Sequence, residues 1–346
     1  MTAVVPQTPA SPLDEVRAWF ADRASGVDDG GEDVRAGLAW LGAADLIAPD
    51  GSGLPQAVTL VEAVAGECLS SAFSLWAQRI VVEYLSRGAG EHADVLVGLR
   101  TGERVGATAM APALRDLAGL EPVPVRATPD GEGLRLDGPI RWASNLFPGA
   151  AVVLPVRVGE SGRAVVRIDT DRAGVQVAVR PELLALNGTA SSSVTLDEVR
   201  VEPHEILARD LAGFVGPVRP AFLLIQAAFC SGLARRSAQE AERAATGANA
   251  ELAPDAAAAV GRAVALHERL HAAAAAPHAL APADLLRLRL DAARTATDAT
   301  RVEAAARGGA GYLVGSPVAR RLREGAFLPI QSPTEGHLRW ELSRCA

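Results

Sequence analysis

The sequence contains no lysine, so all 34 of its basic side chains are arginines, and it is poor in aromatic residues, at 4%. We interpret the missing lysine as a genomic bias rather than a functional device. The scarcity of aromatic residues, together with alanine runs such as residues 272–276, favours closely packed helices. Hydrophobic residues make up 49% of the chain, which indicates a globular protein, and a length of 346 residues suits two or three packed units.

Other absences exclude several classes of partner and location. A net charge of -7 argues against nucleic acid, because a polyanion needs a basic surface. The three cysteines are widely spaced and predict no disulfide framework. Residues 1–12 lack the pattern of a signal peptide, and we expect no apolar stretch long enough to span a membrane. The run around Gln226 is interpreted as a buried helix. We therefore expect a cytoplasmic protein.

Periodicity divides the chain into three zones. Apolar residues recur at helical spacing in residues 1–103 and 209–346, and the longest helices are predicted at 221–244, 255–276 and 283–307. In residues 104–208, short β-prone runs alternate with turns such as Pro129-Asp130-Gly131 and Asp137-Gly138. The sequence therefore predicts an α+β protein with an N-terminal helical domain, a central β-domain and a C-terminal helical bundle.

Five short motifs accompany these zones. They are Thr101-Gly102-Glu103, Arg141-Trp142-Ala143-Ser144-Asn145, the segment 197–203, Gly308-Gly309-Ala310-Gly311-Tyr312, and Pro317-Val318 followed by Arg323-Glu324. In this order, and over most of the chain, the set resembles the acyl-CoA dehydrogenase family. Each motif alone has modest specificity, and the resemblance depends on their common register.

The resemblance implies an FAD enzyme, normally a homodimer or homotetramer, that acts on an acyl thioester of CoA or an acyl carrier protein. In the family, a glutamate removes the α-proton while the flavin N5 takes the β-hydride. Trp142 would then cover the flavin and Ser144 would donate to N5. Backbone amides could approach the cofactor closely at three glycines of the turn, Gly308, Gly309 and Gly311. Each of these residues also has a purely structural interpretation. Trp142 could be a core residue, Ser144 a hydroxyl at a strand edge, and the glycines the C-cap of a helix.

The catalytic glutamate is where the sequence departs from the family. The register from Gly308 onward places Ser332 at its usual position, and the alternative position carries Phe222. A serine hydroxyl cannot act as a general base near neutral pH without help. Glu335 is a candidate for a displaced base. However, residues 332–335 also fit a capping box with Ser332 as N-cap, which would use the Glu335 carboxylate on the backbone.

The cofactor motifs are also altered. Where the family has Val-Thr-Glu-Pro, this chain has Ala109-Met110-Ala111-Pro112, so a flavin-facing hydroxyl is lost at Met110. Thr108 lies two residues earlier on the same strand face and can substitute for it. The family's arginine to the FAD pyrophosphate is missing from residues 248–252. Losing one charge-assisted contact costs about 1.5–3 kcal/mol, which weakens FAD binding without abolishing it.

Two further clusters of basic side chains offer candidate ligands. His267 and His271 have the i, i+4 spacing of metal ligands, but no third ligand lies nearby in sequence. A solvated helix face is the preferred interpretation, and no metal is predicted. Arg320, Arg321 and Arg323 fit either a phosphate contact to FAD or CoA, or a solvated helix face.

Three functions remain open from the sequence. The first is an FAD-dependent oxidoreductase of acyl-CoA dehydrogenase type. The second is a flavin-dependent monooxygenase on the same scaffold, which needs no α-proton base. The third is a degenerate, non-catalytic member that has lost FAD.

Overall fold

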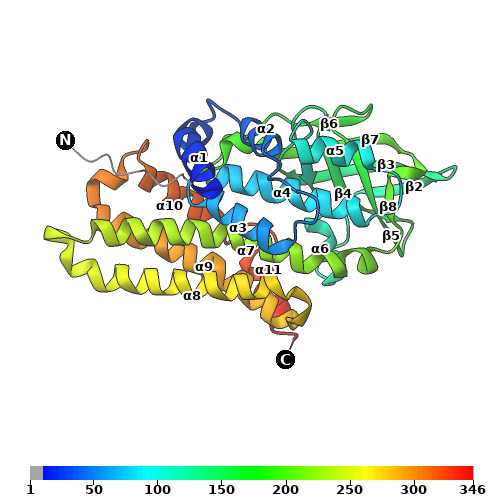
Figure 1. Cartoon of the computed structure of the whole chain (residues 1–346). Coiled ribbons are helices and arrows are strands. Elements are labelled where there is room, and N and C mark those ends of the chain that lie inside the picture. The colour runs from blue at the N-terminus through cyan, green and yellow to red at the C-terminus, as the bar shows by residue number, and fades with distance from the viewer. Residues whose placement is uncertain (1–10, 346) are drawn as a thin grey trace.

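The computed structural model describes residues 11–345, and its elements fall into the predicted order of helices, strands and helices (Figure 1). The N-terminal helices are α1 (Pro12–Asp29), α2 (Arg35–Ala43), α3 (Leu54–Ala65), α4 (Leu69–Arg87) and α5 (Ala93–Thr101). The C-terminal helices are α7 (Leu211–Ala244), α8 (Ala253–Ala275), α9 (Pro282–Arg307), α10 (Pro317–Phe327) and α11 (Glu335–Leu342). Figure 1 shows α7, α8 and α9 side by side, with the strands gathered at the opposite end of the molecule.

The central region forms an eight-stranded sheet with the short helix α6 (Ala111–Leu117) after its first strand. Its strands are β1 (Gly106–Thr108), β2 (Arg126–Asp130), β3 (Gly133–Ala143), β4 (Ala151–Val158), β5 (Gly162–Asp169), β6 (Val175–Val177), β7 (Ser192–Val201) and β8 (Ile206–Ala208). Their order is β6-β7-β3-β2-β4-β5-β8, and β1 pairs with β4 off this path. The pairs β1–β4 and β2–β4 are parallel and the others are antiparallel.

Strand β4 joins the sheet to the helices. Its side chains alternate between two faces, as strand geometry requires. Val152, Leu154 and Val156 pack within the apolar core of the sheet. Ala151 and Val153 belong instead to the larger core formed with the helices. The sheet is therefore covered by helices on the face that borders the site described below.

Two predicted boundaries were wrong. Asp137-Gly138 is not a turn, because β3 continues through it with a shift in register against β7 between Leu136 and Gly138. Gly138 has a φ of 124°, so glycine serves here in an irregular strand position. The helix predicted at 221–244 begins ten residues earlier, at Leu211, and contains Pro217 and Pro220.

Helix α7 is the one helix within residues 11–345 that is long and apolar enough to cross a membrane by length and composition. The expectation that no such stretch exists was therefore wrong. However, α7 packs against α3, α4, α8 and α9, and 61% of its most apolar window is buried. Gln226, within that window, is fully buried, as the sequence predicted for a core helix.

Candidate functional site

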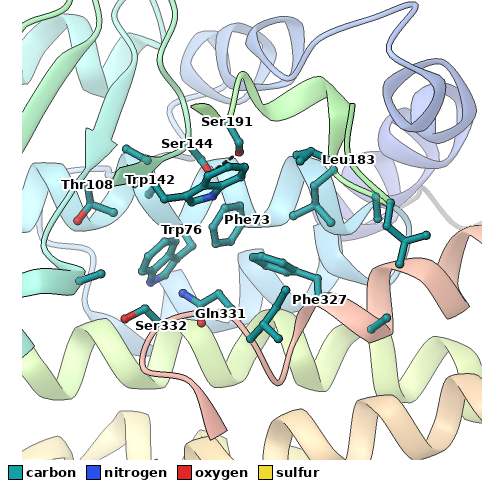
Figure 2. Close-up of a pocket in the computed structure, with 18 of the residues that line it drawn as sticks. Phe73, Trp76, Thr108, Trp142, Ser144, Leu183, Ser191, Phe327, Gln331 and Ser332 are labelled. Carbon is teal, nitrogen blue, oxygen red and sulfur yellow. Dashed lines mark hydrogen bonds between the residues drawn. The ribbon is translucent and has the colours of Figure 1, made fainter. Parts of the chain in front are cut away.

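A cavity of about 500 Å³ lies where the sheet meets the helices (Figure 2). Its walls come from α4, the ends of β1 and β3, the loop 183–186, α7, and the segment from α10 to the start of α11. Six segments from different parts of the sequence thus converge on one cavity. Its volume falls within the range of small-molecule and cofactor sites.

Aromatic side chains make most of the cavity wall. Phe73 and Trp76 on α4 are stacked, with ring centroids 5.2 Å apart and planes 21° apart. Phe327 and Phe222 meet them edge-on, at 5.1 Å from Phe73 and Trp76 respectively. Trp142, at the end of β3, lines the same cavity and is half-exposed, at 50%. These flat apolar surfaces suit a planar aromatic ligand.

A chain of hydroxyl groups leads into the cavity at Ser144. Thr189 donates its hydroxyl proton to the carbonyl oxygen of Leu186 over 2.7 Å, because a carbonyl can only accept. Ser191 must therefore donate in its 2.7 Å contact with Thr189, and Ser144 in its 2.6 Å contact with Ser191. With its proton used in this way, Ser144 offers lone pairs to the cavity. As placed, it is an acceptor, whereas the resemblance implied a donor.

Ser332 also lines the cavity, and a buried arginine fixes the segment that carries it. Arg289 on α9 is 1% exposed and donates to Gln226 at 3.0 Å and to Gln331 at 2.7 Å. Gln226 in turn donates to the carbonyl oxygen of Ser332 at 2.9 Å. Burial lowers the pKa of Arg289. The Ser332 segment is thus fixed by a buried polar network of Arg289, Gln226 and Gln331, which sequence reasoning did not identify.

Glu335 lies outside the cavity wall. Its carboxylate binds Arg294 at 2.6 Å and lies 3.7 Å from Arg339. The predicted capping box was also wrong: helix α11 begins at Glu335, and its N-cap is Thr334, whose hydroxyl accepts from the amide of His337. The amide of Glu335 donates instead to the carbonyl of Pro329. No residue that lines this cavity in the described chain is a carboxylic acid.

The two candidates on the β1 side separate. Thr108 lines the cavity, and its hydroxyl lies 3.4 Å from that of Tyr84. Burial raises the pKa of the Tyr84 hydroxyl. Met110 is 3% exposed and faces a second, smaller cavity that it shares with Tyr84 and Phe222. Of the pair, Thr108 therefore occupies the position from which a hydroxyl reaches the larger cavity.

The glycine motif lies away from this cavity within the chain. Residues Gly308–Tyr312 form a 3₁₀ turn, and Gly308, with a φ of 59°, is the C-cap of α9. Gly308 and Gly309 are exposed, while Gly311 is buried against Val318. The next side chains, Tyr312, Leu313 and Val314, are exposed as well. The turn thus has the helix-ending role that the sequence allowed, and its role at a cofactor stays a prediction.

The basic cluster on α10 is mostly structural. Arg320 and Arg321 are buried, at 7% and 5% exposed, so a solvated helix face was wrong for both. Arg321 pairs with Glu303, and Arg320 pairs with Glu324 at 3.5 Å. Arg323 binds Asp28 and also lines the cavity. It is the one charged residue among the described residues that form the wall.

No protein-family model and no curated protein matches the sequence. Solved structures with similar folds do match. The chain is similar to glutaryl-coenzyme A dehydrogenase in complex with glutaryl-CoA, with a TM-score of 0.85, 15% identity, and coverage of 98% of this chain and 96% of that one. It is similar to butyryl-CoA dehydrogenase from Megasphaera elsdenii, with a TM-score of 0.82, 17% identity and coverage of 98% and 99%. It is also similar to PigA with FAD and proline, with a TM-score of 0.81, 16% identity and coverage of 99% of each chain. The α+β fold predicted from the sequence is confirmed.

Proposed function

We propose that this chain, which has the fold of acyl-CoA dehydrogenases, binds FAD and acts as a flavin-dependent oxidoreductase on an acyl thioester of CoA or a carrier protein. The observation that carries the proposal is the aromatic-walled cavity at the junction of sheet and helices. Among similar structures, one is described with FAD and another with glutaryl-CoA. We further expect a cytoplasmic homodimer or homotetramer, because a flavin site shared between subunits requires at least two copies.

The residues present fit a flavin ring. Trp142 would cover one face of the ring, and the walls around Trp76 would exclude water from it. Thr108 and Ser144 would bind its polar edge. Because Ser144 offers lone pairs as placed, it would accept from a ring N–H, and it would donate only by releasing Ser191. When bound, the flavin would supply hydride acceptance, and the chain would supply orientation and a dry site.

The missing carboxylate decides between two chemistries. Dehydrogenation needs a base, and Glu335 could serve only after leaving Arg294 and moving to the cavity. The two side chains are 29% and 48% exposed, so breaking the pair itself costs at most about 1 kcal/mol. A second candidate function, a flavin-dependent monooxygenase on an acyl thioester, needs no such movement. It is favoured by the absence of a carboxylic acid from the described cavity wall.

A pair of assays on protein reconstituted with FAD separates these functions. Dehydrogenation predicts that acyl-CoA or acyl carrier protein bleaches the flavin without oxygen, and that Glu335→Gln abolishes the bleaching. Glu251→Gln, an exposed carboxylate on the 3₁₀ turn Gly247–Leu252, is the matched control and should bleach normally. Monooxygenation predicts no anaerobic bleaching, but oxygen consumption and an oxygenated product when reduced flavin is supplied. The proposal is refuted, in favour of a non-catalytic member, if the protein shows neither behaviour or takes up no FAD.

A further inference from the structure

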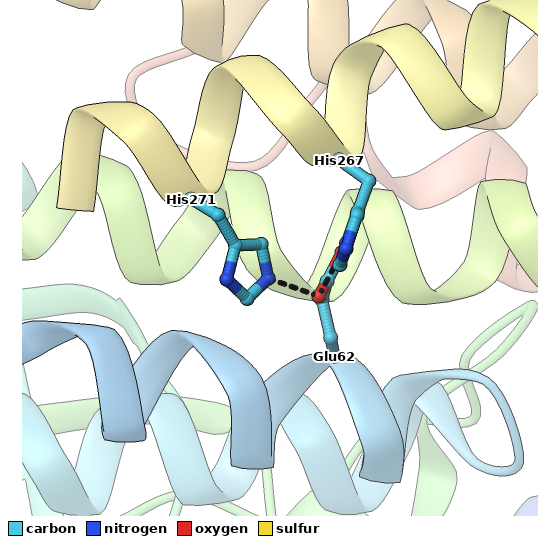
Figure 3. Close-up of side chains that lie close together, drawn as sticks. All are labelled: Glu62, His267 and His271. Carbon is cyan, nitrogen blue, oxygen red and sulfur yellow. Dashed lines mark hydrogen bonds and ion pairs between the residues drawn. The ribbon is translucent and has the colours of Figure 1, made fainter. Parts of the chain in front are cut away.

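Three side chains of the kinds that ligate metals meet where α8 packs against α3 (Figure 3). Glu62 comes from α3, and His267 and His271 come from α8. The Nδ1 atom of His267 lies 3.0 Å from each carboxylate oxygen of Glu62, and the Nε2 atom of His271 lies 2.7 Å from one of them. One ligand atom from each of the three residues lies within 4.8 Å of the others.

The fold explains why these groups converge. The spacing of His267 and His271 places both rings on one face of α8, and their centroids are 4.2 Å apart. That face packs against α3 and α7. Glu62 is only 5% exposed, while both histidines are about one-third exposed. The histidines therefore lie on a partly exposed face, as expected in part, and what the sequence did not show is their partner Glu62, which stands 205 residues from His267.

We propose that Glu62, His267 and His271 form a binding site for a divalent transition-metal ion of the zinc class. Two imidazole nitrogens and one carboxylate are ligands that Zn²⁺ prefers. Bonds of about 2.1 Å in a tetrahedral site set ligand atoms roughly 3.4 Å apart. The present distances of 2.7 and 3.0 Å are those of hydrogen bonds, so the partly exposed rings would move outward by less than 1 Å.

The site is accessible from solvent. A cavity of about 530 Å³ has Glu62, His267 and His271 in its wall, which gives an ion a path and leaves room for water as a fourth ligand. The hydroxyl of Ser231 on α7 donates to Glu62 and orients its carboxylate from the buried side. The ion would thereby link the N-terminal helix α3 to the C-terminal helix α8.

Arg235 is one of three arginines in the wall of this cavity, with Arg17 and Arg236, and it opposes a cation most directly because it contacts the proposed ligands. Its guanidinium lies 3.3 Å from Nδ1 of His267 and 3.9 Å from the Glu62 carboxylate. Its side chain is 37% exposed, so it can turn into the cavity when an ion enters. The proposal therefore makes an unusual prediction: removing this arginine should strengthen metal binding, although the arginine provides no ligand.

The test is calorimetric titration of the full chain with ZnCl₂, in the absence of flavin and in a Cys345→Ser background that removes the exposed thiol. We expect one saturable site per chain. His271→Gln should weaken it by at least tenfold, since even loss of a group that only supports a ligand costs 10–100-fold. His278→Gln, an exposed histidine outside the cluster, is the matched control and should bind normally. Arg235→Gln should bind more tightly than the parent.

A second readout separates loss of the site from loss of the fold. Co²⁺ in place of Zn²⁺ should give the visible absorption bands of a tetrahedral site in the parent and in the His278→Gln variant. The His271→Gln variant should lack these bands although its circular dichroism spectrum is unchanged, which shows that it is folded. The proposal is overturned if the parent shows no saturable site. It is also overturned if a folded His271→Gln variant binds like the parent, or if Arg235→Gln weakens binding. None of these outcomes depends on whether the protein binds FAD.

Discussion

Asn145 should be one of the most sensitive positions for stability, although it lies in a loop. It follows β3, is fully buried, and has a φ of 64°. Its amide donates to the carbonyl oxygens of Ser74 at 3.1 Å and Gly106 at 2.9 Å, and its side-chain oxygen accepts from the Ser74 hydroxyl. It therefore ties the end of β3 to α4 and β1, next to the cavity.

The magnitude follows from these contacts. Asn145→Gly keeps the left-handed backbone but loses three buried hydrogen bonds, which at about 1 kcal/mol each, plus desolvation of the groups left behind, amounts to roughly 3–5 kcal/mol. Asn145→Ala loses the same bonds and adds about 1–2 kcal/mol for the left-handed conformation. The unfolded state of the alanine variant is more restricted than that of the glycine variant, which returns roughly 0.4–1 kcal/mol of stability. The Asn145→Ala variant should thus be less stable than the Asn145→Gly variant by about 0.5–1 kcal/mol.

Urea denaturation followed by circular dichroism measures both differences, provided that the m-values match. Asn249→Gly is the matched control, because Asn249 is exposed and makes one side-chain hydrogen bond, 3.0 Å to the carbonyl of Ala306. It should cost no more than about 1 kcal/mol. The reasoning is refuted if Asn145→Gly costs no more than this control, or if Asn145→Ala is as stable as Asn145→Gly.

Two further predictions concern packing and pH. A Cβ at Gly232 would lie 2.3 Å from the carbonyl oxygen of Glu62, so Gly232→Ala should force α3 away from α7 and cost at least about 1–3 kcal/mol in urea denaturation. A Cβ at Gly261 on α8 would meet nothing within 4 Å, so Gly261→Ala should gain up to about 1 kcal/mol in the same assay. Equal effects at both glycines would contradict this packing. Burial alone would raise the pKa of Glu205, but hydrogen bonds and the charge of Arg172 lower it below 4.5 overall, so its contribution is complete above pH 4.5 and is lost as the pH falls through the lowered pKa. The stability lost in Glu205→Gln should therefore be largest near pH 7 and shrink below pH 4.5, and a loss that does not vary with pH would refute this.

The fold could be predicted because its signals are local and cover most of the chain. The helices at 255–276 and 283–307 begin and end within three residues of the observed α8 and α9. The errors arose where one local pattern fits two structures. Asp137-Gly138 can form a turn or an irregular strand position, and pairing with β7 decided for the strand. The predicted start of α11 was wrong because two contacts outside the capping-box motif set the backbone there. The amide of Glu335 donates to the carbonyl of Pro329, and Gln226, distant in sequence, donates to the carbonyl of Ser332.

The candidate site could be predicted only in part. The sequence motifs identify Trp142, Ser144, Thr108 and Ser332 as candidates, and all four line one cavity. The direction of the hydroxyl chain could not be foreseen, because it depends on a carbonyl oxygen at Leu186. Long-range partners were missed for the same reason. A sequence does not show that an arginine of α9 supports the Ser332 segment, or that a glutamate of α3 meets the histidines of α8.

The most direct test of the central claim is the visible spectrum of the protein after incubation with excess FAD and gel filtration. We predict bound flavin in the parent chain. We also predict loss of flavin in Ala326→Trp, which fills the cavity from an exposed position on α10, but not in Ala258→Trp, on an exposed face of α8 away from the cavity. No retained flavin in the parent, or equal flavin in Ala326→Trp, would contradict the assignment of this cavity to FAD.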